Sequence, residues 1–338
     1  CIAPSPAKSG VIWTGTDDGN VHITQNNGEV WENCIDRMKG APKGAWIPQI
    51  EPSRNHPGEA FVVVNDYRRN NWEPYLYHTT DYGRKWTRII DASDVNGHVL
   101  CVVQDPVEPR LLFAGTENGL YVSFDYGESW NHWTHDYPNV STMDLKIHPR
   151  EHDLIIGTFG RAAYILDDIT PLREMAASEG AMTDRALQLL HATPGWYVDY
   201  TQPAGIRFPG DAHWRGENKP SAVMMSLWAR IDGEGDSPTI GEGAPKKGDK
   251  AEKAVVRIMN TAGDTLRMYD TEIDTTGVHR IYWGMDTNGL RWPSWRDRKE
   301  EKMPPGGGMS PEAGSYIMVV EFMDARDSLE IQVNNDPR

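Results

Sequence analysis

The chain of 338 residues lacks several features that define common protein classes. It has only three cysteines, Cys1, Cys34 and Cys101, too few for a disulfide framework. No apolar run approaches the roughly 18 to 20 residues of a membrane-spanning helix. Basic residues are few: 34 Lys and Arg stand against 49 Asp and Glu, for a formal net charge of −15. This charge argues against nucleic acid or an anionic membrane as a partner, because both require a basic face.

Phenylalanine is also scarce, with 6 residues against 13 Trp and 13 Tyr. Aromatic side chains with a polar group suit binding surfaces, and they also suit sheet cores in which that group reaches a partner. At this length the chain has room for two ordinary domains.

One short motif occurs three times: Ser or Thr, any residue, Asp or Asn, any residue, Gly, two residues, Trp. Its positions are Thr24, Asn26, Gly28 and Trp31; Thr79, Asp81, Gly83 and Trp86; and Ser123, Asp125, Gly127 and Trp130. The tryptophans are 55 and 44 residues apart (86 − 31 and 130 − 86). Such a period indicates a repeat architecture whose unit is a small sheet.

The residue types of the motif predict a hairpin turn. The hydroxyl and the carboxylate or amide oxygen can accept or share hydrogen bonds with nearby backbone N–H groups. Glycine permits a positive φ where a Cβ would clash. We expect each Trp to pack beneath its turn, between neighbouring strands, so the motif predicts a structural role and no chemistry.

Short apolar strands, Pro-containing turns and Gly-Thr steps surround each motif up to about residue 172, with hairpin signals at 17–19 and 117–119. Four such units predict an all-β fold with four β-propeller blades over 1–175. A linker or short helix is expected at 176–185. Alternating strands over 186–338 predict an immunoglobulin-like or fibronectin-like β-sandwich, with long solvated loops at 232–252 and 296–314.

The motif resembles the Asp-box, or bacterial neuraminidase repeat. The stretches "GTDDGNVHITQNNGEVW", "PYLYHTTDYGRKW" and "DLKIHPREHDLIIGTFGRAAYILDDITPL" are similar to bacterial sortilin-like propeller proteins that are often labelled glycosyl hydrolases. This resemblance covers nearly the whole chain, most strongly up to Leu172. It implies the C-terminal part of a propeller followed by a β-sandwich, in a secreted, cell-surface or periplasmic bacterial protein. The family's usual Gly-Thr-His-Gly-Arg run has Phe159 in place of His here, so any role of that His is absent.

The resemblance also implies more blades than four, supplied by the same polypeptide or by another chain, because sheet edges are not left open. "CIAPSP" aligns with the middle of a blade boundary, which favours Cys1 as a point inside a longer polypeptide over a lipid-modified first residue. By the same resemblance, Arg338 is not expected to be the native end.

Catalytic motifs are weak, and no catalytic residue is assigned. A sialidase needs an arginine cluster, whereas the one Arg-aromatic-Pro run, at 206–209, follows the blades instead of preceding them. A glycosidase needs two carboxylates roughly 5 to 10 Å apart. The Asp17–Asp18 and Asp167–Asp168 pairs both lie in turns. The histidines at 132, 135, 148 and 152 have spacings of three and four, which suit zinc only on a helix, and Pro138 and Pro149 place them on loops. No metal and no cofactor are expected.

Two loops are rich in aromatic and cationic residues, and such loops gather at the ends of propellers, where ligands bind. The candidate ligand-binding residues are Tyr67, Arg68, Arg69, Trp72, Trp133, His135, Tyr137 and Arg161. Aromatic faces beside Arg suit sugar rings or extended peptides. The leading hypothesis is a binding or scaffolding module for a peptide, protein or glycan. The alternatives are a glycoside hydrolase with paired carboxylates and an accessory subunit of a larger envelope complex.

Overall fold

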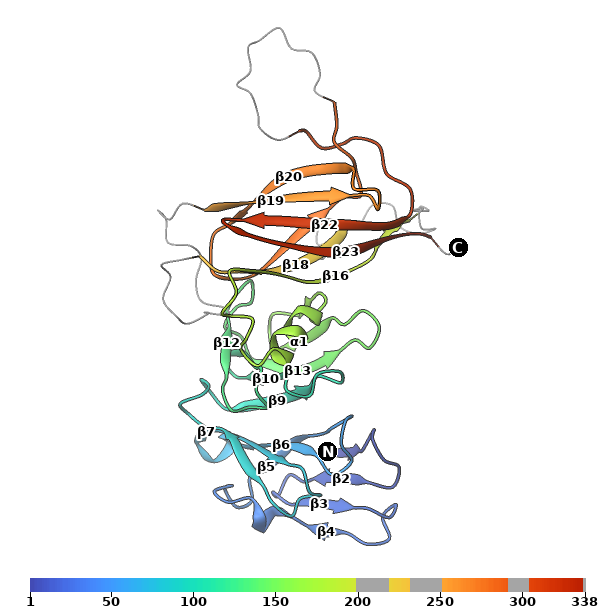
Figure 1. Ribbon diagram of the computed structural model, residues 1–338. Helices are drawn as coiled ribbons and strands as arrows, with labels where there is room; N and C mark the ends of the chain where they lie inside the picture. The colour runs from blue at the N-terminus through green and yellow to red at the C-terminus, as the bar shows by residue number, and fades with distance from the viewer. Residues whose placement is uncertain (199–218, 232–250, 291–303, 337–338) are drawn as a thin grey trace, which may run out of the picture. The chain divides into compact units, whose positions relative to one another are not determined.

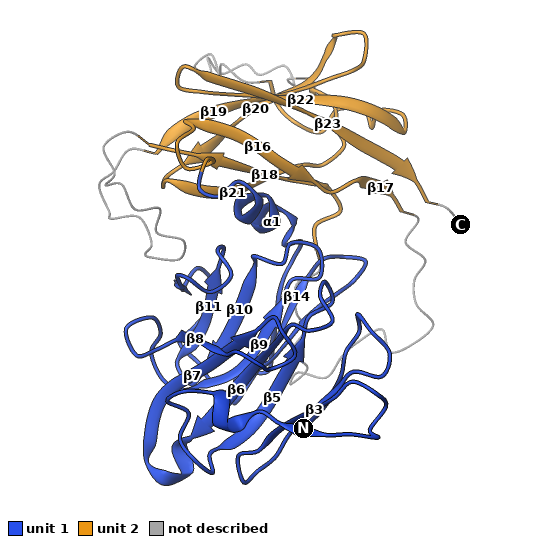
Figure 2. Cartoon of the chain, turned by 60° about the horizontal axis from the view of Figure 1, so that its bottom comes forward, with its two compact units in different colours: residues 1–180, 239–244 blue, residues 181–238, 245–338 orange. Residues whose placement is uncertain are grey.

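The computed structural model describes residues 1–198, 219–231, 251–290 and 304–336. These residues form two compact units, the first ending at Gly180 and the second beginning at Ala181 (Figure 2). Three predicted features lie partly or wholly outside the described residues: the run at 206–209, most of the loop at 232–252, and residues 296–303 of the second loop.

Unit 1 consists of four consecutive antiparallel sheets, each built from strands that are also consecutive (Figure 1). The first two sheets contain β1 (Ile2–Pro4), β2 (Ile12–Gly15), β3 (Val21–Thr24) and β4 (Glu32–Asn33), then β5 (Trp46–Pro52), β6 (Ala60–Asp66), β7 (Asn71–Thr79) and β8 (Thr87–Ile90). The other two contain β9 (Val99–Gln104), β10 (Leu112–Thr116), β11 (Gly119–Ser123) and β12 (Asn131–Trp133), then β13 (Thr142–Ile147), β14 (Leu154–Thr158) and β15 (Ala163–Leu166). This up-and-down order is that of propeller blades.

The fourth sheet differs from the other three, because it has three strands instead of four. After β15 the chain enters helix α1 (Thr170–Ala177), with Pro171 in its first turn, where the missing N–H costs no hydrogen bond. The backbone N–H of Thr170 donates to Asp168 Oδ1 at 3.1 Å. Part of the Ala-rich stretch expected as a linker or short helix therefore belongs to α1.

The first strands of successive sheets are neighbours: β1 lies by β5, β5 by β9, and β9 by β13. Side chains join them, since Gln49 Nε2 donates to the Val102 carbonyl at 3.0 Å and Gln49 Oε1 accepts from the Val102 N–H at 2.7 Å. One apolar cluster, including the fully buried Trp13, spans the first and second sheets. Another, including Phe61 and Leu112, spans the second and third. Adjacent sheets are thus packed face to face.

Because the strands run up and down, the turns of unit 1 fall at two opposite ends. The β2–β3, β6–β7 and β10–β11 turns share one end with the connections between sheets, and we call this the loop end. The three Asp-box turns, β3–β4, β7–β8 and β11–β12, lie at the opposite end. All the candidate ligand-binding residues of the sequence therefore belong to the loop end, away from the Asp-boxes.

Unit 2 contains two sheets around one apolar core. One sheet orders β16 (Leu187–Ala192), β18 (Val223–Ala229) and β21 (Gly277–Trp283). The other orders β17 (Gly195–Tyr197), β23 (Ala325–Asn335), β22 (Gly314–Phe322), β19 (Glu252–Met259) and β20 (Thr265–Ile273). The segment 260–264 joins β19 to β20, and the two residues Met323 and Asp324 join β22 to β23. The unit is all-β, and its assignment to the immunoglobulin-like class stays a prediction.

Candidate functional site

All three Asp-boxes have the same hydrogen-bonded turn. In the second box, Thr79 Oγ1 donates to Asp81 Oδ1 at 3.0 Å and accepts from the Gly83 N–H at 3.2 Å. Asp81 Oδ1 also accepts from the Lys85 N–H at 2.8 Å. The first and third boxes repeat these contacts, and the three glycines have φ of +95°, +75° and +87° in chain order. The side-chain oxygens of each box are therefore engaged in the turn itself.

The box tryptophans contact the preceding sheet. Trp86 packs edge-on against Trp13 of the first sheet, with ring centroids 5.9 Å apart. Trp130 donates from Nε1 to the carbonyl oxygen of Ile89 in the second sheet at 2.9 Å. Trp31 belongs to the first sheet and is 42% exposed. Trp31 does lie against Gly28 of its own turn, but unlike the other two tryptophans it has no described sheet to pack on and stays exposed.

At the loop end, residues of neighbouring sheets meet through Tyr67 and Arg68. Arg68 Nη1 lies 2.6 Å from Asp17 Oδ1 of the first sheet, and its guanidinium lies 4.6 Å from the ring centroid of Trp46. The Tyr67 ring stacks on His98, at the start of the third sheet, with centroids 5.4 Å apart. The Trp72 ring lies 5.6 Å from the same histidine. Three of the predicted ligand-binding residues thus come together.

His98 is the buried centre of this aromatic group, with a side chain only 4% exposed. Burial lowers the pKa of His98, while the nearby Glu117 acts in the opposite direction. The Nδ1 atom lies 3.2 Å from Glu117 Oε2. Ser141 Oγ donates to the Glu117 carbonyl, which extends the contacts to the connection before the fourth sheet. The loop end is therefore a continuous surface and not a set of separate loops.

A groove of about 680 Å³ opens beside Trp72. It is lined by Asn70, Asn71, Trp72, Glu73, Pro74, Ala92, Ser93, Asp94, Val95, Asn96, Gly97 and Tyr121. One wall comes from the β6–β7 turn and the start of β7, and the other from the β8–β9 connection. Trp72 is 53% exposed, so an aromatic face is available next to polar side chains.

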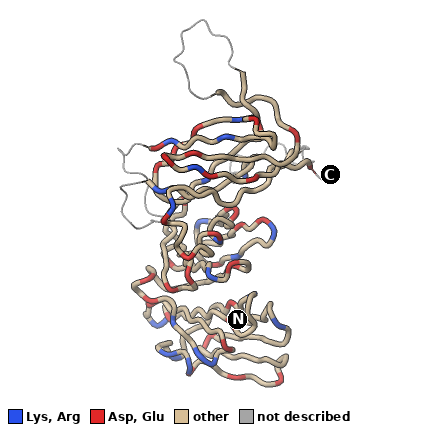
Figure 3. The backbone as a smooth tube through the Cα atoms, viewed as in Figure 1, with Lys and Arg blue, Asp and Glu red and all other residues tan. Residues whose placement is uncertain are grey.

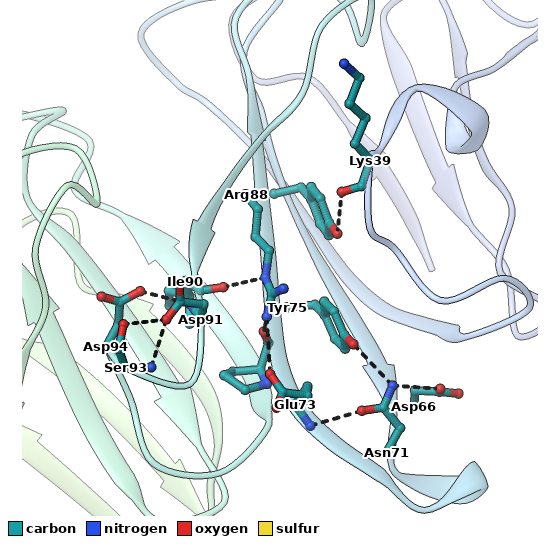
Figure 4. Close-up of polar contacts among 12 residues, drawn as sticks. Lys39, Asp66, Asn71, Glu73, Tyr75, Arg88, Ile90, Asp91, Ser93 and Asp94 are labelled. Atoms are coloured by element: carbon teal, nitrogen blue, oxygen red, sulfur yellow. Dashed lines mark hydrogen bonds and ion pairs between the residues drawn. The ribbon is translucent and has the colours of Figure 1, made fainter.

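Hydrogen bonds fix both walls of the groove (Figure 4). Asn71 Nδ2 donates to Asp66 Oδ2 at 3.1 Å and to the Tyr75 hydroxyl at 3.2 Å. On the other wall, Asp91 Oδ1 accepts from the N–H and hydroxyl of Ser93, which lowers the Asp91 pKa. The Asp91 N–H donates to Asp94 Oδ2 at 2.8 Å. Both walls are therefore positioned without a ligand.

Arg88 contacts residues of one wall of this groove and of its own strand β8. Its Nε donates to the Ile90 carbonyl at 2.9 Å and its Nη2 to the Pro74 carbonyl at 2.7 Å (Figure 4). The guanidinium stacks over the Tyr75 ring at 4.4 Å, and Nη2 lies 3.6 Å from Glu73 Oε2. The cation therefore supports the wall and does not line the groove.

Among the predicted ligand-binding residues, only Trp72 lines this groove. Trp133 donates from Nε1 to the carbonyl of His135, which is exposed. Tyr137 is buried, with its hydroxyl 2.7 Å from Thr142 Oγ1, so its proposed role at an accessible surface is corrected. Arg161 is exposed on the β14–β15 turn.

Arg69 is engaged with Asp66, its Nε donating to Oδ1 at 2.6 Å. Sequence reasoning missed the β8–β9 wall, although "DASDVNG" at 91–97 is a marked turn segment.

A second group of ionisable residues lies on the first strands of the sheets. Burial raises the pKa of Glu51, on β5, to about 7, against the opposing effects of Lys146 and Arg54. Asp144, on β13, raises it further. Within the described residues, no group of three or more His, Cys, Asp or Glu side chains is arranged to hold a metal ion, and no helix is long and apolar enough to cross a membrane.

No family model and no curated protein matches the sequence. Solved structures similar to parts of the chain include a GH74 enzyme of Niastella koreensis, with 15% identity, a TM-score of 0.35 and coverage of 49% of this chain and 22% of that one. YCF48 bound to D1 peptide has 13% identity, a TM-score of 0.36 and coverage of 72% and 66%. The GH74 xyloglucanase from Xanthomonas campestris has 11% identity, a TM-score of 0.40 and coverage of 97% and 44%.

The chain therefore spans between 22% and 66% of the length of these proteins. Its own features, three hydrogen-bonded Asp-boxes on consecutive up-and-down sheets, make unit 1 a set of β-propeller blades of the Asp-box type.

Proposed function

We propose that unit 1 is a binding module whose loop end takes a glycan or a peptide. The observation that supports this is the pre-positioned groove beside Trp72, which combines an exposed indole face with amide and carboxylate groups. Aromatic faces with adjacent polar groups are the usual way in which proteins bind sugars and extended chains. The Asp-box side chains contribute nothing to this site, because they lie at the opposite end.

The test is a glycan array and a peptide array probed with the whole chain and with Trp72→Ala. Trp133→Ala is a matched control, since it removes a tryptophan from the same end but outside the groove. We expect binding that Trp72→Ala abolishes and Trp133→Ala leaves intact. Absence of any binding, or equal loss in the two variants, would refute a site at the groove.

Glycoside hydrolysis is the second candidate, favoured by one observation. A carboxyl group with a pKa near 7, such as Glu51, is protonated often enough at neutral pH to act as a general acid. Asp144 would be the nearby second carboxylate. Release of reducing sugar from neutral polysaccharides, abolished in Glu51→Gln, would support this function, and no release by the wild-type chain on any substrate would remove it.

We also propose that further propeller sheets pack against unit 1. Trp31 supports this, since its two equivalents contact a preceding sheet while it remains exposed. On the fourth sheet, Ile165 and Phe159 are likewise exposed. The further sheets would come from the same polypeptide or another chain. Protection of Trp31 from oxidative footprinting in material isolated from its source, but not in the recombinant chain, would support this proposal, and equal labelling would oppose it.

We also propose a cellular location for the protein and a role for unit 2. The resemblance of its repeats to bacterial sortilin-like propellers supports a secreted, cell-surface or periplasmic location. Unit 2 would then act as an immunoglobulin-like β-sandwich that braces or spaces the blades. Fractionation of the source cells followed by immunodetection tests the location, and detection confined to the cytoplasm would overturn it.

A further inference from the structure

We infer that the groove beside Trp72 takes an uncharged sugar ring and discriminates against acidic sugars. This inference rests on the proposed function, and it specifies the ligand of that site. It is carried by three properties of the groove: a fixed aromatic face, an alternation of unengaged donors and acceptors, and a lining that contains two carboxylates and no cation.

The aromatic face is fixed by its own hydrogen bond. Trp72 Nε1 donates to Asn70 Oδ1 at 3.2 Å, so the polar edge of the indole is satisfied within the protein. The ring also lies 6.2 Å from Tyr67 and 5.6 Å from His98, which support it from the side. An exposed ring held in this way can stack on the C–H face of a sugar without first losing rotamer freedom.

The groove also offers hydrogen-bonding atoms of both kinds that no described residue uses. Asn70 and Asn96 engage their Oδ1 atoms with Trp72 and Asn118, which leaves their NH₂ groups as donors. Asp94 engages only Oδ2 and Glu73 only Oε2, which leaves Oδ1 and Oε1 as acceptors. A sugar hydroxyl both donates and accepts, so it can satisfy either kind of atom.

The alternation of donors and acceptors distinguishes a sugar from a basic peptide. A lysine or arginine side chain has donors only, so it would pair with Asp94 and Glu73 but leave the amide NH₂ groups of Asn70 and Asn96 without acceptors. Unpaired polar groups in a contact reduce affinity, because they lose water without replacement. The groove therefore fits a neutral polyhydroxylated ring better than a cation.

Charge excludes acidic sugars. The lining residues include the carboxylates of Glu73 and Asp94 and no Lys, Arg or His. Asp91 adds a third carboxylate behind the wall, held ionised by its bonds to Ser93. Arg88 is engaged with two carbonyl oxygens, an aromatic ring and Glu73, which leaves Asp94 as the lining carboxylate without an ion-pair partner among the described residues.

Figure 3 shows Asp and Glu distributed over both units, with Lys and Arg among them. The carboxylates of Glu73 and Asp94 are the charged groups that line the groove itself. A sugar carboxylate a few ångströms from these groups would be repelled, and we expect at least about tenfold weaker binding for it.

The experiment is calorimetric titration of the whole chain at pH 7 with four probes: cellohexaose, maltohexaose, hexagalacturonate and hexalysine. We expect at least one neutral hexasaccharide to bind, and hexagalacturonate to bind at least about tenfold more weakly. Trp72→Ala should abolish binding of the neutral probe.

A double variant with Asp94→Asn and Glu73→Gln should show a smaller difference in affinity between the neutral and the acidic probes. The two side-chain amides introduced in that variant retain oxygens for the existing contacts, and circular dichroism checks the fold. Asp136→Asn is the control, because it removes an exposed loop-end carboxylate outside the groove.

The outcomes separate this inference from the proposed function. Hexagalacturonate binding as tightly as the neutral probes, or hexalysine binding without any sugar, would overturn the inference while leaving a binding module in place. A charge-neutralised variant that discriminates as strongly as the wild type would also overturn it. No binding by any of the four probes, combined with no hit on either array, would remove both.

Discussion

The different environments of the three Asp-box tryptophans lead to a prediction about stability. Replacing Trp86 by Ala should destabilise unit 1 strongly, whereas replacing Trp31 by Ala should change its stability little. The two residues occupy the same position in the same motif. They differ in that Trp86 packs on Trp13 of the preceding sheet, while Trp31 has no described sheet to pack on.

The expected magnitude follows from burial and contacts. Truncating a fully buried Trp to Ala costs about 3 to 5 kcal/mol, and an edge-on aromatic pair contributes about 0.5 to 1.5 kcal/mol of its own. Trp86 is partly exposed, so we expect a loss of about 3 kcal/mol. For a unit of this size, that corresponds to a fall in Tm of roughly 6 to 12 °C. Trp31→Ala should cost about 0.5 kcal/mol, as for surface positions.

Hydrogen exchange followed by mass spectrometry is the suitable assay, because two units need not unfold in one transition. Peptides from β6 and β7 should exchange faster in Trp86→Ala, while peptides from unit 2 serve as an internal reference. Trp86→Phe is the matched control and should recover part of the loss through the remaining ring. Equal effects of Trp31→Ala and Trp86→Ala would refute the idea that a box tryptophan acts through the preceding sheet.

Three further predictions concern buried charges. In the wild type, Nη2 of the buried Arg173 on α1 lies 2.9 Å from Asp105 Oδ2. Asp105→Ala removes this partner and should lower the free energy of unfolding, measured with urea, by about 3 to 5 kcal/mol. A loss below about 1 kcal/mol would contradict this. Glu51 has a pKa of about 7 in the folded chain against 4.5 in the unfolded chain, so the free energy of unfolding should fall as pH rises from 4.5 to 7. Glu51→Gln should therefore be more stable than the wild type at pH 8, by about 3 kcal/mol, but not at pH 4.5. His98 has a lowered pKa, so stability should fall as pH drops below 6.5, and His98→Gln should weaken that dependence in thermal melts at pH 5 to 7.

Much of unit 1 could be predicted from the sequence because its signals are local. The hydroxyl, acidic and glycine positions of an Asp-box contact one another within five residues, so their spacing alone specifies the turn. The third box shows this, with Ser123, Asp125 and Gly127 bonded as their order implies. The same holds for the hairpins at 17–19 and 117–119.

The exposure of a box tryptophan could not be predicted, because it depends on a neighbouring sheet. Trp31 and Trp130 have equivalent sequence contexts, yet only Trp130 finds a carbonyl of the preceding sheet. The sequence also did not predict that the last sheet has only three strands. After β15 the chain forms α1 instead of a strand, and this helix buries Leu172 and Arg173 through tertiary contacts.

The candidate site was predicted only in part. Of the predicted residues, Trp72 lines the groove and Tyr67 lies beside it, and the sequence indicated both because aromatic residues are unusual in a polar loop; their role in binding stays a prediction. Asp94 was not predicted, because its segment has the composition of any solvated turn. It lines the groove only because the β8–β9 connection lies opposite the β6–β7 turn in the fold. Aromatic content also misled: Tyr137 turns inward to bond Thr142, an option that sequence does not reveal.

Trp86 and Trp130 each contact the sheet that precedes their own in the sequence, which implies an order of assembly for the unit. A ribosome delivers the chain from its amino end, so each blade emerges before the residue that will clamp it. The second sheet would be fastened only once Trp130 has left the exit tunnel and met Ile89. During synthesis, the most recently formed blade would therefore be the least stable one. A translational pause just after an Asp-box would leave the fewest strands without their tryptophan contact and so open to wrong pairing.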